Sequence, residues 1–88
     1  MSSMNGRVVI HEKDRGGHGH IIIEEGEYNF KLFRPGRRIK TVVVLKSMVL
    51  DDPNIRVEKW TYEEIKRTLG PEAAAAAQEA FTGEINGR

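Results

Sequence analysis

The chain has 88 residues, which is enough for one domain with a modest core, so we expect a single domain over residues 1–88. It contains no cysteine, which excludes thiol catalysis and cysteine-based zinc sites and favours a reducing, cytoplasmic compartment. The formal net charge is +1, but residues 1–46 carry nine Lys and Arg against five Asp and Glu, whereas residues 47–88 carry five against eight. This asymmetry indicates a surface that binds anions.

Residues 7–50 have the composition of an antiparallel sheet. They are rich in Val, Ile, Phe and Tyr and are interrupted by Gly and Pro, which favour tight turns. The interruptions leave four predicted strands, near residues 7–13, 18–24, 27–33 and 38–49. Residues 55–59 are a candidate fifth strand.

Side-chain alternation predicts which strand residues form the core. If each hairpin is symmetric, Lys13 faces His18, Glu24 faces Glu27 and Phe33 faces Arg38. One face of the sheet is then almost entirely apolar. The residues on this predicted core face are Val8, Ile10, Ile21, Ile23, Tyr28, Phe30, Leu32, Ile39, Thr41, Val43 and Leu45.

The C-terminal third carries helix signals. Thr61 and Glu64 have the spacing of a capping box, and Trp60 and Ile65 have the spacing of a hydrophobic staple around the same helix start. Gly70-Pro71 ends this helix and begins a second one that we expect to end near residue 82, because Pro suits a first helical turn.

These elements predict an α+β fold. The expected architecture is a four- to five-stranded antiparallel β-meander over residues 7–50, with two short helices over residues 61–82 packed on one face. A small curled β-barrel with a C-terminal helix is the alternative.

The same alternation predicts an open face with one basic corner. Several cations within a Debye length of about 8–10 Å add their potentials and attract phosphate groups. An aromatic side chain among them can stack on a nucleic-acid base. The predicted anion-binding residues are Lys31, Phe33, Arg34, Arg37, Arg38 and Lys40. The alternative is a solvated face whose cations prevent aggregation.

An apolar row crosses the same open face. It consists of Val9, Ile22, Val42 and Val44. Such residues on a polar face suit burial by a second subunit or a partner, so we expect an interface there, with a scattered patch of no functional meaning as the alternative.

The histidines are the candidate metal ligands. The symmetric register places His11 opposite His20, with His18 on the same side of its strand, and three imidazoles can bind a metal. The neighbouring lysines disfavour a divalent cation. We therefore predict no metal and no cofactor.

Catalytic chemistry has weak support in the sequence. The acidic runs at residues 24–27 and 51–52 lie in predicted turns, where carboxylates stay solvated and ionised. We expect a small non-catalytic binding or regulatory protein whose basic sheet face contacts an anionic partner, nucleic acid first. The alternative is a protein-interaction module or inhibitor of the phage- or operon-encoded type, including a homo-oligomer through the apolar row. We expect no membrane association.

Overall fold

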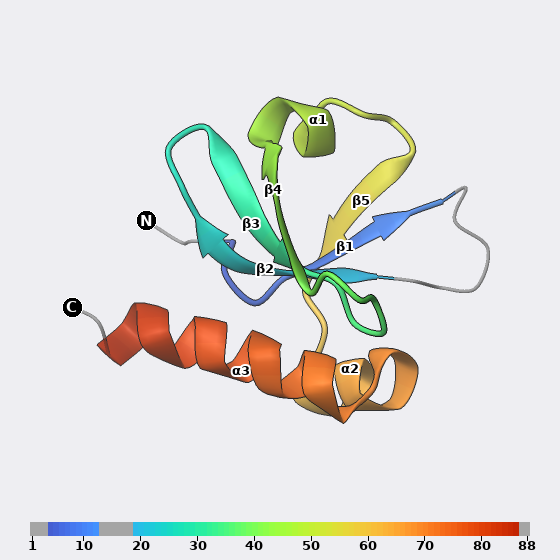
Figure 1. Ribbon diagram of the computed structural model, residues 1–88, viewed down its shortest axis with the longest axis vertical. Helices are drawn as coiled ribbons and strands as arrows, with labels where there is room; N and C mark the ends of the chain where they lie inside the picture. The colour runs from blue at the N-terminus through green and yellow to red at the C-terminus, as the bar shows by residue number, and fades with distance from the viewer. Residues whose placement is uncertain (1–3, 13–18, 87–88) are drawn as a thin grey trace.

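The chain folds into one antiparallel sheet with helices on both sides (Figure 1). The computed structural model describes residues 4–12 and 19–86, the last five of them by their backbone alone. The strands are β1 (Val8–His11), β2 (His20–Glu25), β3 (Asn29–Phe33), β4 (Thr41–Leu45) and β5 (Ile55–Glu58), in the order β4-β3-β2-β1-β5. The helices are α1 (Lys46–Leu50), α2 (Tyr62–Leu69) and α3 (Pro71–Asn86).

The predicted α+β fold is confirmed, and the sheet is not closed into a barrel. β4 and β5 are its two edges, and α2 and α3 lie together along one face (Figure 1). The candidate fifth strand is present and pairs with β1, where Val9 lies opposite Val57. In the described part of the chain, no helix has the length and apolarity needed to cross a bilayer.

The central strands β1 and β2 are buried on both faces, which corrects the prediction of one core face and one open face. The core residues against α2 and α3 are Val8, Ile21, Ile65, Ala73, Ala74 and Ala77. The core residues on the other face are Val9, Ile22, Phe30, Leu32 and Val49. Val49 comes from α1, so this short helix contributes to the core on the face that the sequence pattern predicted to be open.

The hairpin registers explain this difference. Ile21 lies opposite Phe33, and the register shifts between Ile22 and Glu24, so that Glu24 lies opposite Lys31 instead of Glu27. A shift by an odd number of residues moves every side chain of a strand to the other face. β3 is therefore turned over relative to the prediction, and its aromatic Phe30 enters the second core cluster.

The helix boundaries agree with the sequence signals in part. Thr61 caps α2, where its hydroxyl accepts from the Glu64 N–H and the Glu64 carboxylate accepts from the Thr61 N–H, both at 3.2 Å. Trp60 packs against the core cluster that contains Ile65. By contrast, the predicted last strand ends at Leu45 rather than 49 because α1 follows it at once, and α3 continues beyond residue 82 to Asn86.

Candidate functional site

The β3–β4 connection, residues 34–40, is a compact loop that brings together four of the six predicted anion-binding residues. We call these seven residues the basic loop; its cations are Arg34, Arg37, Arg38 and Lys40. The Arg34 N–H donates to the Lys40 carbonyl at 2.6 Å, and the Arg37 N–H donates to the Arg34 carbonyl at 3.3 Å. Gly36 has φ of 76°, which suits the third position of a Pro-Gly type II turn. The arginines are therefore carried on a hydrogen-bonded turn.

Most of the positive charge on the basic loop is not neutralised within the described chain. Lys40 Nζ lies 3.3 Å from Glu72 Oε1 on α3, and both side chains are about half exposed, so this ion pair is weak. Among the described residues, no ion pair involves an arginine of the loop. Arg37 and Arg38 are exposed, and Arg34 is half-buried. The loop therefore presents guanidinium groups to solvent.

Contrary to the prediction, Lys31 and Phe33 do not lie with the cations of the basic loop. Lys31 is exposed but lies opposite Val43, whereas the symmetric hairpin placed it opposite Lys40. Phe33 is half-buried and packs against the core cluster beneath α2 and α3. The seven-residue loop shifts the register that a tight turn would have set, and this removes Phe33 from the role of an exposed stacking ring.

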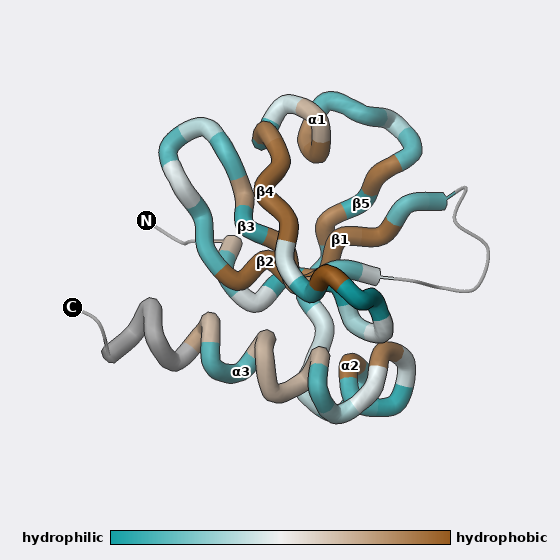
Figure 2. Tube along the Cα trace, in the orientation of Figure 1, coloured by the Kyte–Doolittle hydropathy of each residue, from teal (hydrophilic) through white to brown (hydrophobic). Residues whose placement is uncertain are grey.

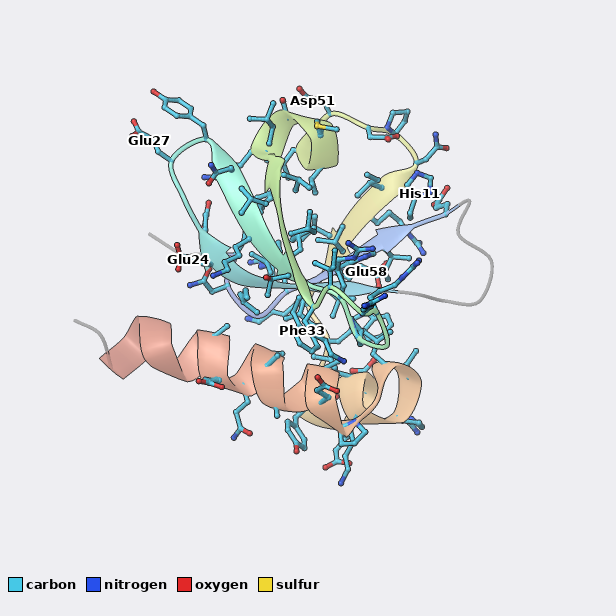
Figure 3. All side chains as sticks on the ribbon, viewed as in Figure 1. His11, Glu24, Glu27, Phe33, Asp51 and Glu58 are labelled. Atoms are coloured by element: carbon cyan, nitrogen blue, oxygen red, sulfur yellow. The ribbon has the colours of Figure 1, made fainter. Side chains whose placement is uncertain are left out.

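A hollow between the sheet and α3 lies beside Phe33. It has a volume of about 510 Å³ and is lined by Asn5, Ile23, Glu24, Phe33, Ala76, Glu79 and Ala80. Figure 3 shows Glu24 and Phe33 on the side of the sheet that α3 faces. Its two carboxylates repel phosphate groups, so the hollow does not extend the anion-binding surface of the basic loop. Sequence reasoning missed it because Glu24 and Glu79 come from distant segments.

The apolar row predicted as an interface lies inside the protein. Val9 and Ile22 are 5% and 0% exposed, and Val42 and Val44 pack against the same core cluster. The four residues do share one face of the sheet, as predicted. They belong to one core cluster with Phe30, Leu32 and Val49, so the predicted interface is not available to a partner.

The histidines are not arranged as the symmetric register predicted. His11 lies opposite Ile55 of β5, and His20 lies opposite Val9, so the two histidines are not directly opposite each other. His18 lies outside the described residues. Within residues 4–12 and 19–86, no group of three or more His, Asp and Glu side chains is arranged to hold a metal ion.

Sequence reasoning also missed an exposed apolar surface along β4 and α1. We call it the β4 surface; its residues are Ile39, Val43, Leu45, Met48 and Leu50, with exposed fractions of 49–67%. Figure 2 shows the hydrophobic trace of β4 running into α1. Ile39, Val43 and Leu45 were predicted to be core residues. The cross-strand pairs place Val43 and Leu45 on the side of the sheet that carries Phe33, yet both remain exposed.

The described residues thus offer two distinct surfaces. The basic loop carries unpaired guanidinium groups that can donate to phosphate or carboxylate oxygens. The β4 surface is apolar and borders a sheet edge. Comparisons of this chain with protein-family models, curated proteins and solved structures find no match.

Proposed function

We propose that this chain is a small, non-catalytic regulatory protein that binds an anionic partner, nucleic acid first, through the basic loop. The observation that carries the proposal is the exposure of Arg37 and Arg38 on a hydrogen-bonded turn, with no carboxylate partner in the described part of the chain. The cysteine-free sequence favours a reducing compartment such as the cytoplasm for this activity.

The chemistry of the loop supports phosphate as the recognised group. A guanidinium presents a planar set of donors that matches two phosphate oxygens and keeps its charge at any physiological pH. The three arginines lie within five residues, so their potentials overlap within one Debye length of about 8–10 Å. A polyanion with regularly spaced phosphates can contact several of these arginines at once, whereas an isolated carboxylate cannot.

The position of Phe33 limits the contacts that we propose. Because Phe33 is packed against the core, base stacking on the sheet is not part of the proposal. The remaining contacts are electrostatic, so we expect binding with little sequence preference and a strong dependence on salt.

Fluorescence polarisation with labelled single-stranded DNA, duplex DNA and single-stranded RNA tests the proposal. We expect binding at low salt that weakens as salt is raised. Arg37→Ala/Arg38→Ala should lower the salt slope by roughly 1.4–1.8, because each lost phosphate contact contributes about 0.7–0.9. Lys66→Ala/Arg67→Ala is the matched control, since it removes two neighbouring exposed cations from α2.

Two results would overturn the proposal. One is the absence of binding to all three probes at low salt. The other is an equal loss of affinity in the loop variant and in the control variant, because that would assign binding to net charge rather than to the basic loop. Both variants must first give the circular-dichroism spectrum of the wild-type protein.

A further inference from the structure

The two edges of the sheet differ in their charge. On β5, Arg56 pairs with Glu12 at 3.4 Å and with Glu58 at 3.5 Å, so this edge carries charged side chains. β4 has the sequence Thr-Val-Val-Val-Leu and carries no charge. Exposed edge strands recruit further strands unless charge, proline or a covering element prevents it. β4 has none of these protections within its own sequence.

Hydrogen bonds at the two ends of β4 determine which of its backbone groups point outward. At one end the Arg34 N–H donates to the Lys40 carbonyl, and at the other the Lys46 N–H donates to the Tyr28 carbonyl at 2.9 Å. Hydrogen-bonded positions alternate along an antiparallel pair. The even-numbered residues from 40 to 46 therefore direct their backbone groups toward β3, and the odd-numbered residues direct theirs away from the sheet.

The outward-facing residues are Thr41, Val43 and Leu45, of which Leu45 is also the N-cap residue of α1 and gives its carbonyl to that helix. Among the described residues, no other strand lies beyond them. They are symmetric about Val43, so a two-fold axis at this residue would bring Thr41 opposite Leu45 of a second copy. The N–H and carbonyl of Val43 would then exchange hydrogen bonds with those of the second copy's Val43, as the central pair of an antiparallel ladder requires.

We infer that β4 pairs with β4 of a second copy of this chain, joining the two sheets into one continuous antiparallel sheet. The cross-strand contacts are then Val43 with Val43 and Val42 with Val44, which are pairs of β-branched residues without charge. The interface is isologous, as expected for a two-fold dimer. Ile39 and Met48, which are 67% and 62% exposed, flank the strand and extend the apolar contact.

Charge at the ends of β4 is compatible with pairing to a second copy. The two-fold register places Lys40 opposite the second copy's Lys46, and two bare ammonium groups there would repel each other. Each lysine is already bound by a carboxylate of its own chain: Lys40 by Glu72 at 3.3 Å and Lys46 by Glu25 at 2.8 Å. At each end the lysine charges are therefore partly offset, strongly for Lys46 by Glu25 and weakly for Lys40 by the half-exposed Glu72, so the repulsion between the two cations is reduced.

Site-specific crosslinking tests the inference, because the chain has no cysteine of its own. In the two-fold register, residue 43 meets itself at a Cα separation of about 5.5 Å, within disulfide range. Residue 45 lies about 13 Å from its own copy, four strand positions away. Under mild oxidation, Val43→Cys should therefore form a disulfide dimer and Leu45→Cys should stay monomeric, whereas a mixture of Thr41→Cys and Leu45→Cys should form the heterologous crosslink.

Sedimentation velocity of the wild-type protein completes the test. We expect a dimer that dissociates on dilution, and the same dimer for Arg37→Ala/Arg38→Ala, because pairing does not depend on the basic loop. The inference is overturned if the wild-type protein stays monomeric up to about 1 mM. The free energy of association would then be weaker than roughly 4 kcal/mol. Crosslinking of Leu45→Cys alone as efficiently as Val43→Cys overturns it as well, because this shows collision or another register.

Discussion

Ile22→Ala tests whether the sheet is buried on both faces. Ile22 is 0% exposed in the second core cluster, whereas the symmetric register placed it on an open face. The substitution removes three carbon atoms, which is about 2.4 kcal/mol of transfer free energy at roughly 0.8 kcal/mol per methylene. The cavity left behind raises the expected loss of unfolding free energy to about 3–4 kcal/mol.

Urea unfolding followed by far-ultraviolet circular dichroism measures this loss. Because most small domains have an unfolding free energy of about 5–15 kcal/mol, the variant should unfold at a much lower urea concentration with an unchanged slope. Ile39→Ala is the matched control, since Ile39 is 67% exposed and should lose less than about 1 kcal/mol. All samples need a protein concentration at which the chain is monomeric, because dimerisation adds to apparent stability and Ile39 belongs to the proposed dimer contact. Equal effects of the two substitutions would refute the burial of Ile22 in the second core cluster.

Other predictions follow from individual contacts. Val43→Pro should leave the monomer fold intact because the Val43 N–H points outward. Val44→Pro removes an N–H that faces β3, so its unfolding free energy in urea should fall by about 3 kcal/mol or more. Equal losses for the two variants would contradict the assignment of β4 as an edge strand with odd-numbered residues facing outward. Gly36→Ala should lose about 1 kcal/mol because its φ is 76°, and no loss would show that the turn adapts. Thr61→Ala should lose about 1 kcal/mol in the same assay, and a loss no larger than that of Thr68→Ala would contradict the capping box. Mixing Val43→Lys with Val43→Glu should restore a dimer that neither variant forms alone, and sedimentation of the mixture as monomers would contradict a contact between the two copies at this residue.

Local signals in the sequence predicted the elements well. Thr61 and Glu64 predicted the start of α2 because a capping box involves only neighbouring residues. The four cations of the basic loop were predicted together for the same reason, since seven consecutive residues cannot be far apart. Pro35-Gly36 likewise predicted the turn that carries them.

Long-range register could not be predicted from alternation, and β3 shows why. The loop of residues 34–40 is longer than a tight turn, and the bulge between Ile22 and Glu24 adds another shift. Neither feature has a local signature in this sequence. The side of the sheet to which Phe33 belongs was therefore assigned wrongly, and with it the stacking role in the candidate site.

Two apolar runs in the sequence did indicate which strands are covered on both faces. Ile21-Ile22-Ile23 and Val42-Val43-Val44 are apolar at odd and even positions alike, a pattern typical of strands covered on both faces. For β2 that interpretation is correct, because Ile21 and Ile22 are both fully buried in different clusters. For β4 the same pattern has another physical origin: Val42 and Val44 pack inward, while Val43 remains 60% exposed.

In the proposed dimer, the distance between the two basic loops sets the length of nucleic acid that both loops can contact. The basic loop directly precedes β4, so antiparallel pairing at Val43 places the two loops at opposite ends of the new ladder, with their Lys40 positions about 20 Å apart along the strands. That distance corresponds to about six base pairs of duplex at 3.4 Å each. A probe long enough to contact both loops gains from effective concentration, whereas a shorter probe contacts one loop only.

Val43→Pro distinguishes contact with both loops from contact with one loop, because it prevents pairing of the two β4 strands without changing the charge of the protein. Its affinity for a long duplex should fall by about 10-fold or more, while its affinity for a probe shorter than the loop spacing should match that of the wild-type protein. Equal losses on both probes would mean that β4 contributes to the binding surface itself. Equal affinities on both would mean that the two loops do not act together, even if the dimer forms.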